Sequence, residues 1–345
     1  MKVFFPQRVI DRHVGGNTTY ARQLELGLTR AGVATGRIPA STSAARTALL
    51  ETWYGMASRH PAGDVLHYSA DTGPLLAPRT PSVVTVHGVA SRWISTARTT
   101  RQEATWRLRV RAAIRSCDEV ITVSHSSAHD VAEVFDVPHE RIRVIHHGID
   151  RAPPVESAMS SGLRDQVPEA YLLYVGNIEP RKNLVALVGA MERPEVKALG
   201  LPLVVAGKPA WNVEDSMAAI NGSSSTIYLG FVSDDDRQHL MRECTAFVFP
   251  SLYEGFGFPV LEAMAAGTPV ITSGRGSLAE VAGPAYRLDE LSPEGIASGI
   301  ADALGSPDEL AASVQSGKSW VEQFSWDKSV AAHLEVYRAV TGASS

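Results

Sequence analysis

Short apolar runs alternate with longer amphipathic segments along almost the whole chain. The runs are rich in β-branched and aromatic residues and lie at 2–5, 64–69, 82–87, 119–124 and 142–147 in the first half, and at 171–176, 201–207, 226–230, 246–250 and 269–273 in the second. Continuous apolar strands separated by helices are typical of parallel sheets buried on both faces. The pattern predicts an α/β protein with two doubly wound, Rossmann-like domains.

A change in composition separates the two halves of this pattern. Residues 151–170 are rich in Pro, Ser and Ala, which predicts a linker between a domain over residues 1–150 and a domain over residues 171–324. Ligands of doubly wound sheets bind beyond the carboxyl ends of the strands. We therefore expect the two domains to face each other across a binding cleft.

A last helix is predicted over residues 325–345. Ser325 is a suitable N-cap, and the apolar residues that follow it lie at helical spacing. These apolar residues are Trp326, Val330, Leu334 and Tyr337. An amphipathic helix needs an apolar partner, so we expect it to pack back on a domain rather than to extend into solvent.

Length and composition narrow the class of protein. A chain of 345 residues suits two domains of about 150 residues each. The two cysteines, Cys117 and Cys244, are far apart and lack metal-ligand spacing, which fits a protein of the reducing cytoplasm. The apolar run at the N-terminus is shorter than a signal peptide, and no run reaches the roughly 18 residues of a membrane span.

The charge is unevenly distributed. Residues 1–150 carry 18 Lys and Arg against 13 Asp and Glu, whereas the remaining residues carry 14 against 24. The net charge of −5 argues against a nucleic-acid-binding protein. The more basic half can still meet an anionic partner.

Two glutamates frame a glycine-aromatic loop in "YEGFGFPVLEAMAAG". Glu254 precedes the loop, whose glycines allow backbone N–H groups to approach a ligand. Glu262 lies in a predicted helix among Val, Leu, Ala and Met. A helix that is apolar all round is buried, so we predict that the Glu262 carboxylate is buried and has a partner.

A cationic pair follows a predicted strand in "GNIEPRKNL". Arg181 and Lys182 stand near the start of a helix, where positive charge opposes the helix dipole. Such a placement is unfavourable for stability alone and suggests a role in meeting an anion. A solvated surface pair is the alternative.

In the first half, a glycine pair and two histidines have chemical potential. Gly15 and Gly16 open a predicted helix, whose N–H groups could approach a phosphate, and they could equally form a simple turn. His87 ends a predicted strand and is therefore expected to point toward the cleft, and a structural role, which is the more common one for a histidine at a strand end, is the alternative. His13 lies next to the glycines, and its sequence context leaves acceptor and phosphate contacts equally open.

The spacing of Glu254 and Glu262 within this loop resembles the signature of family 4 retaining glycosyltransferases of the GT-B fold. Further stretches are similar to that family in the same order: "HVGGNTTYARQL", "VTVHGVAS", "VITVSHSSA", "IRVIHHGID", "YVGNIEPRKNL", "VVAGK" and "IYLGFVSDDD". The resemblance covers nearly the whole chain. It implies an N-terminal acceptor-binding domain, a C-terminal nucleotide-sugar domain and a last helix that returns to the N-terminal domain.

The resemblance also implies roles for the two glutamates. Glu262 would bind the ribose hydroxyls of a nucleotide sugar. Glu254 would bind hydroxyls of the transferred sugar, together with the backbone amides of Phe256, Gly257 and Phe258. By this interpretation the two carboxylates hold the two ends of one donor molecule.

Other residues inherit roles with departures from the family's pattern. Lys182 and Arg181 would bind the diphosphate, although many members carry the arginine where this chain has Asn177. Gly15 and Gly16 would approach a phosphate of the donor. His87 would contact the donor sugar near the reacting carbon, without the Asp that usually follows it.

A second set of arginines forms a basic face. Arg107, Arg111 and Arg115 lie at i, i+4 spacing on a predicted helix, where like charges cost about 0.2–0.5 kcal/mol per pair. A solvated face is the plain interpretation. Docking of an anionic acceptor, or peripheral contact with a membrane surface, is the alternative.

The acidic run "SDDD" at 233–236 has the spacing of a metal-binding motif, but a capped helix start explains it better.

The resemblance as a whole implies a metal-independent, retaining hexosyltransferase without a cofactor. It would use a nucleotide-diphosphate sugar, with GDP-mannose as the first candidate. The acceptor would be a hydroxyl of a polysaccharide, glycolipid or natural product. A GT-B phosphorylase or epimerase, and a non-catalytic sugar-nucleotide-binding module, are the alternatives.

Overall fold

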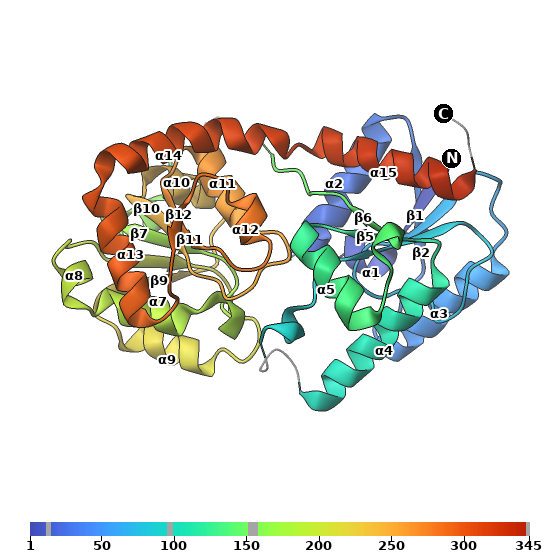
Figure 1. Ribbon diagram of the computed structural model, residues 1–345, viewed down its shortest axis with the longest axis horizontal. Coiled ribbons are helices and arrows are strands. Elements are labelled where there is room, and N and C mark those ends of the chain that lie inside the picture. Colours follow the sequence, from blue (N-terminus) through green and yellow to red (C-terminus); the bar gives the residue numbers. More distant parts are fainter. Residues whose placement is uncertain (12–14, 95–98, 151–157, 343–345) are drawn as a thin grey trace. The chain divides into compact units, whose positions relative to one another are not determined.

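The computed structural model describes residues 1–11, 15–94, 99–150 and 158–342, and the chain divides into two compact units (Figure 1). The first unit comprises Met1–Gly148 and Phe324–Ser345, and the second comprises Ile149–Gln323. The end of the chain thus belongs to the first unit. The helix α15 (Trp326–Thr341) lies there against α2 (Gly16–Arg30).

The first unit is built on a parallel sheet with the strand order β2-β1-β3-β4-β5-β6. Its strands are β1 (Lys2–Pro6), β2 (Ala34–Ile38), β3 (Val65–Tyr68), β4 (Ser82–Val86), β5 (Glu119–Thr122) and β6 (Ile142–Val144). Besides α2 and α15, its helices are α1 (Gln7–Ile10), α3 (Ala44–Ala57), α4 (Thr100–Ser116) and α5 (His125–Phe135), with 3₁₀ turns at Ala90–Arg92 and His139–Arg141.

The second unit repeats the architecture with the strand order β12-β11-β10-β7-β8-β9, again all parallel. Its strands are β7 (Leu172–Val175), β8 (Leu203–Ala206), β9 (Thr226–Gly230), β10 (Ala246–Phe249), β11 (Val270–Ser273) and β12 (Tyr286–Leu288). Its helices are α6 (Ser161–Arg164), α7 (Leu184–Met191), α8 (Pro194–Lys197), α9 (Glu214–Gly222), α10 (Asp234–Glu243), α11 (Phe258–Ala266), α12 (Leu278–Val281), α13 (Pro293–Gly305) and α14 (Pro307–Trp320), with 3₁₀ turns at Pro180–Lys182 and Val321–Gln323.

The prediction of two doubly wound sheets is confirmed, and each of the ten predicted runs contains a strand. Two strands were not predicted, β2 and β12, and both lie at an edge of their sheet. Every residue of β2 except Ile38 is at least partly exposed. An edge strand with solvated side chains needs no continuous apolar run, so the hydrophobic pattern gives no signal for it.

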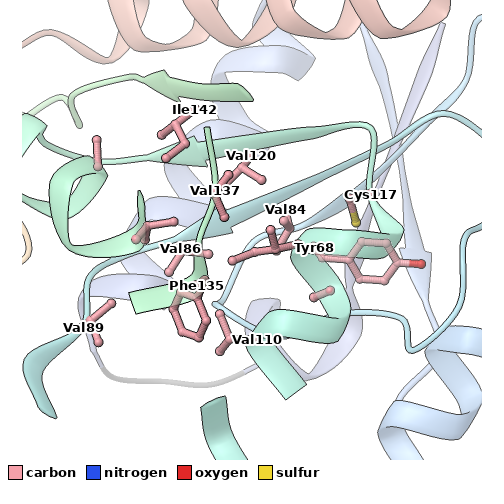
Figure 2. Packing of buried hydrophobic residues seen from close by; sticks show 14 of the residues in the cluster. Tyr68, Val84, Val86, Val89, Val110, Cys117, Val120, Phe135, Val137 and Ile142 are labelled. Atoms are coloured by element: carbon pink, nitrogen blue, oxygen red, sulfur yellow. The ribbon is translucent and has the colours of Figure 1, made fainter. Parts of the chain in front are cut away.

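Buried side chains cover both faces of the first sheet, as the apolar runs predict. Neighbouring strand residues such as Val83 and Val84 point to opposite faces and belong to different core clusters. On one face, Val84 and Val120 pack with Val110 of α4 and Phe135 of α5 (Figure 2). The other face packs against α2 and α15.

The segment predicted as a linker is partly structured. Residues 151–157 lie outside the described residues. The rest contains α6 and buries Met159, Leu163 and Val167, which recur at intervals of four. Residues 158–170 therefore pack as part of the second unit rather than forming a solvated connection, because their apolar side chains are buried there.

A buried hydrogen-bond chain joins α15 to α2 in the first unit. The Ser329 carbonyl lies 2.7 Å from Nδ1 of His333 and can only accept, so Nδ1 carries the proton. Nε2 of His333 then accepts from the Tyr20 hydroxyl at 2.7 Å. Both side chains are fully buried, so this order of donors requires a neutral histidine.

The chain continues into the sheet below. The Tyr20 oxygen accepts from the Thr85 hydroxyl at 2.9 Å, and Thr85 accepts from Nε2 of His67 at 2.7 Å. Nδ1 of His67 in turn accepts from the Tyr337 hydroxyl on α15 at 2.6 Å. Every member has its hydrogen bonds satisfied with both imidazoles uncharged, which fixes the docking of α15.

This network makes the first unit sensitive to acid. Burial lowers the pKa of His333 to about 4 and that of His67 well below its usual value. Because an unfolded histidine has a pKa near 6.5, the unfolded state binds more protons below that pH. Stability is therefore lost as the pH falls from about 6.5 towards 4, and His333 alone should cost about 2 kcal/mol between pH 7.5 and 5.

Urea unfolding of the first unit, followed by circular dichroism at both pH values, measures this loss. The variant His333→Gln should start less stable, because it disturbs the chain, but should lose less stability on acidification. Equal losses in the wild type and the variant would contradict this role of His333.

Candidate functional site

The second sheet has a topological switch point between β7 and β10. From β7 the chain proceeds outward through β8 and β9, and from β10 it proceeds in the opposite direction through β11 and β12. Ligands of open α/β sheets bind beyond the carboxyl ends of the strands at such a point. The loops at 176–183 and 250–257 follow these two strands, and they contain the cationic pair and Glu254.

These loops bring Glu254, Arg181 and Lys182 into one cluster. Lys182 Nζ donates to Glu254 Oε1 at 2.6 Å, and Arg181 pairs with the other oxygen of Glu254 and with Glu179. Arg181 Nη1 also donates to the carbonyl of Tyr253 at 2.9 Å. Lys182 and Glu254 are each only 6% exposed, so the cationic pair is not a solvated surface pair.

The electrostatics of the cluster are those of a buried, charge-balanced group. Burial alone would raise the pKa of Glu254, but Arg181 and Lys182 outweigh it and hold that pKa at about 2. Burial and the neighbouring Arg181 lower the pKa of Lys182, and the carboxylates partly offset them. The ammonium group also lies 4.6 Å from the centre of the Phe249 ring. The two cations are therefore already oriented without a ligand.

The loop that carries Glu254 is held in place by hydrogen bonds from the loop that follows a third strand, β11. Ser277, in the loop after β11, donates its N–H to the Glu254 carbonyl at 3.1 Å and its hydroxyl to the Phe256 carbonyl at 2.7 Å. Gly276 has a φ of +59°, and a Cβ there would lie 2.7 Å from the Glu254 oxygen. A close approach of two backbones thus fixes the loop, and only glycine allows it.

The loop ends at an uncapped helix. Gly257, with a φ of +107°, is the N-cap of α11 and offers no side chain to the first N–H groups. Buried Phe256 and half-buried Phe258 flank it, with ring centroids 5.2 Å apart. Pro259, the second residue of the helix, has no N–H group, and the N–H of Val260 donates to the Gly257 carbonyl at 3.1 Å. The helix therefore begins with a tight turn of its own backbone and without a side-chain cap.

The predicted burial of Glu262 is wrong, although its predicted partner exists. Its side chain is 20% exposed and accepts from Arg237 Nη1 of α10 at 2.6 Å. Phe258, Glu262 and Ala266 form one half-exposed stripe of α11. Alanine is small enough to line an accessible helix face, so an apolar sequence did not mean burial on every side.

Asn177 lies beyond the end of β7 and is exposed. Its carbonyl accepts from the hydroxyl of Tyr174 at 3.0 Å. The amide side chain therefore stands at the switch point, near the start of the loop that carries the cations. Its predicted contact with a donor stays a prediction.

In the first unit, Gly15 is the N-cap of α2, has a φ of +112° and provides no capping side chain. Gly16 is the first residue of that helix, as predicted. Among the described residues, no heavy atom lies within 4 Å of the position that a Cβ of Gly15 would take. His13 lies outside the described residues.

His87 directly follows β4 and is half-buried. Its Nε2 donates to the Ser69 carbonyl at 3.0 Å, which leaves Nδ1 as the acceptor, and its backbone N–H donates to Asp71 at 2.8 Å. Burial lowers its pKa, with Asp71 acting in the opposite direction. His87 is thus a neutral hydrogen-bonding group at neutral pH.

The basic face on α4 is less free than the sequence suggests. Arg107 pairs with Glu103 one turn earlier, and Arg111 donates to the Val134 carbonyl at 3.3 Å. Arg115 is exposed. Two of the three predicted docking arginines therefore have partners within the first unit, which the pattern of like charges could not reveal.

The acidic run starts α10, as predicted. Ser233 is the N-cap and accepts from the N–H of Asp236, and the acids occupy the first turn. The Asp236 carboxylate also accepts from the N–H of Ser160 at 2.9 Å. The capped-helix interpretation is confirmed.

Sequence reasoning missed three charged partners at these sites: Glu179, Arg237 and Asp71. Glu179 stands two residues before Arg181, and a carboxylate so close to a cationic pair was a usable signal. Arg237 and Asp71 reach Glu262 and His87 from other parts of the chain. Long-range pairs of this kind leave no local pattern.

The sheet order and the charged switch point define a two-unit Rossmann-like protein with a charged cluster beyond the strands of its second sheet. Residues 56–152 match the family model described as "Glycosyltransferase Family 4", and residues 160–320 match "Glycosyl transferases group 1". The chain belongs to this family of glycosyltransferases.

Similar curated proteins include O-antigen chain mannosyltransferase B of Escherichia coli, which is 30% identical over 66% of this chain and 62% of its own length. Glycogen synthase of Mycobacterium tuberculosis is 30% identical over 75% of this chain and 63% of its own length. The matched part of the chain thus spans about three fifths of the length of these relatives.

Solved structures support the fold. Sucrose-phosphate synthase of Thermosynechococcus elongatus has a TM-score of 0.77 at 19% identity, over 99% of this chain and 100% of that chain. HepE of Anabaena, solved with UDP-glucose, has a TM-score of 0.70 at 18% identity, over 97% of this chain and 100% of that one. These similarities establish the GT-B fold.

Across the part of the chain that the structure describes, no helix combines the length and the apolar character needed to cross a membrane.

The two glutamates should differ sharply in their contribution to stability. Glu254→Gln leaves the buried Lys182 without its counter-charge and leaves Arg181 with Glu179 alone, and it should cost about 3–5 kcal/mol of unfolding free energy. The matched variant Glu262→Gln disturbs a more exposed pair and should cost about 1 kcal/mol or less. Chemical denaturation of the second unit measures both, and similar losses would contradict the buried cluster.

Proposed function

We propose that the chain is a retaining hexosyltransferase that transfers a sugar from a nucleotide-diphosphate donor to an acceptor hydroxyl. The single observation that carries the proposal is the buried cluster of Lys182, Arg181 and Glu254 at the switch point of the second sheet. Two oriented cations beside an uncapped helix start suit a diphosphate leaving group. Family membership supports the reaction class.

In this proposal the donor lies along the loop at 250–257 and the start of α11. Glu262 binds the ribose hydroxyls, and Arg237 orients that carboxylate. Backbone amides of Phe256, Gly257 and Phe258, with Asn177 nearby, contribute further donor contacts. Gly15 and Gly16 offer the uncapped start of α2 to a phosphate, and His87 contacts the donor sugar through its Nδ1.

Glu254 takes two roles in succession. Without a donor it neutralises Lys182 and Arg181, at a distance of 2.6 Å from the lysine. When a diphosphate arrives, its oxygens compete for the same two cations, and the Glu254 carboxylate becomes available to accept hydrogen bonds from sugar hydroxyls. In this exchange the two cations always face an anion, and the carboxylate always has hydrogen-bond donors.

The chemical step follows from this charge arrangement. The glycosidic bond to the diphosphate breaks as the acceptor oxygen attacks from the same face, through an oxocarbenium-like state. The proton of the acceptor hydroxyl passes to the departing phosphate oxygen, which lies on that face. Lys182 and Arg181 stabilise the negative charge that gathers on the departing diphosphate. We propose that these cations suffice without a metal ion or cofactor.

The donor is proposed to be GDP-mannose. The name of the O-antigen chain mannosyltransferase supports a mannosyl donor, whereas the HepE structure was solved with UDP-glucose. The acceptor is a hydroxyl of a saccharide, a lipid-linked sugar or a small molecule. The reaction is proposed to take place in the cytoplasm, with peripheral membrane contact as an option for a lipid-linked acceptor.

The donor site is tested by thermal unfolding in the presence of GDP, UDP, dTDP or ADP, and of the sugar conjugates of each nucleotide. A ligand at 100 times its dissociation constant stabilises the chain by about 2.7 kcal/mol, which gives a measurable shift in Tm. We expect GDP and GDP-mannose to give the largest shift, and Glu262→Ala to abolish it. The exposed Glu195→Ala is the matched control and should keep it. Absence of any shift would argue for a protein without a donor site.

Product analysis tests the mechanism. With an α-linked donor, the one-bond carbon–proton coupling at the anomeric carbon of the product should show an α-linkage, because the proposed displacement retains configuration. Turnover should be unchanged by EDTA, because the two cations replace a metal at the diphosphate. A β-linked product would exclude retention, and loss of turnover that Mg²⁺ restores would exclude metal independence.

A further inference from the structure

The first unit contains a cavity of about 500 Å³ at one flank of α4. Its size falls in the range of small-molecule sites. The lining residues come from α4 and from the loop after β3, and they are Thr72, Arg101, Gln102, Thr105, Trp106 and Arg109. None of them had a role in the site described above.

The position of the cavity in the fold favours a ligand site. The first sheet reverses its direction between β1 and β3, because β2 lies beyond β1 whereas β4 to β6 follow beyond β3. The loop that carries Thr72 follows β3, at the carboxyl end of that strand. The cavity therefore lies beside the switch point of its own sheet, where open α/β sheets bind ligands.

Two rows of α4 side chains face the cavity. Arg101, Thr105 and Arg109 recur every four residues, and Gln102 and Trp106 form the adjacent row. At 1.5 Å rise per residue, the two arginines stand about 12 Å apart along the helix. Trp106 also packs against the core, with its ring centroid 6.1 Å from that of Phe135, so its ring is held in place.

The cations in the cavity are not neutralised by the protein. Among the described residues, neither Arg101 nor Arg109 forms a salt bridge, and Arg109 Nε lacks a hydrogen-bond partner. The carboxylate of Glu51 is the acid that acts on Arg109. It is 4% exposed, and burial raises its pKa to about 7 against the opposing effect of Arg109, so it is only partly ionised at neutral pH.

The start of α4 is capped by its own side chains. Thr99 and Gln102 form a capping box, in which each side chain bonds to the other's backbone N–H. The N–H of Glu103 donates to the Thr99 carbonyl. The positive charge of the cavity therefore comes from its arginine side chains.

We propose that this cavity binds the acceptor, and that the acceptor is an anionic saccharide: a sugar ring that carries a phosphate or a carboxylate. The guanidinium groups match the anion in geometry and charge. The Thr72 hydroxyl and the side-chain NH₂ of Gln102 match sugar hydroxyls, and the Thr105 hydroxyl, which donates to the Arg101 carbonyl at 2.8 Å, can still accept from one. The indole ring of Trp106 matches the apolar face of a pyranose. The assignment to the acceptor rests on the proposed transferase function, whereas the binding of such a ligand does not.

Isothermal titration of the full chain, without a donor, tests the proposal. The probes are glucose 6-phosphate, glucuronic acid, glucose and inorganic phosphate. We expect one or both anionic sugars to bind at least tenfold more tightly than glucose and than phosphate alone, since only they engage both kinds of partner. The stronger of the two identifies the anion as phosphate or carboxylate.

Variants place the binding in the cavity. Arg109→Gln should weaken the anionic sugar at least tenfold, and Arg101→Gln should do so without risk to the fold, because Arg101 is exposed. Arg115→Gln, on the same helix but outside the cavity, is the matched control and should bind normally. Equal weakening by Arg115→Gln would assign binding to the basic face in general and overturn the proposal.

The remaining outcomes are also decisive. If neither anionic sugar binds, the proposal is overturned. If phosphate binds as tightly as glucose 6-phosphate, the cavity is an anion site alone, and the proposal of a saccharide ligand is overturned. Glu262→Ala should keep anionic sugar binding, and Arg109→Gln should keep the Tm shift with the nucleotide. The two sites therefore fail separately, and a failed donor test leaves this one intact.

Discussion

The second unit depends on one constraint, the requirement that buried charges be paired. Lys182 and Arg181 stand in the loop after β7, where the burial of their charges would be costly without the carboxylates of Glu254 and Glu179. The Glu254 carboxylate forms an ion pair with the Lys182 ammonium group at 2.6 Å. The surrounding features then follow: Gly276 lets the supporting loop approach, Ser277 fixes the carbonyls, and Gly257 leaves the helix start open.

In the first unit, neutral hydrogen-bonding groups fix the last helix on the sheet. Its sheet binds the last helix of the chain through tyrosine, threonine and histidine side chains whose donors and acceptors run in one order. A charge anywhere in this chain would lack a counter-ion, so the histidines stay neutral. The same physical rule, that buried polar groups must be satisfied, thus yields ion pairs at one switch point and an uncharged network in the other unit.

The arginines of α4 show that the neighbouring residues determine whether a positive charge is neutralised within the unit or faces a cavity. Arg107 and Arg111 have acceptors within the unit, whereas Arg101 and Arg109 face a cavity where the nearby acid is only partly ionised. From sequence alone, all of them are cations on one helix. The difference arises from which side of α4 each residue occupies and from what packs against that side.

The sequence by itself determined the class of fold and the place of the candidate site between β7 and β10. Ten apolar runs predicted the buried strands, because a central parallel strand must be apolar on both faces, and the glycine-aromatic loop and cationic pair fell at a switch point. Tertiary structure decided the rest. The edge strands β2 and β12, the exposure of Glu262, its pairing with Arg237 and the cavity beside Trp106 depend on which segments meet in space. Periodicity reports a residue's own helix or strand, and it carries no record of the partner that packs against it from elsewhere in the chain.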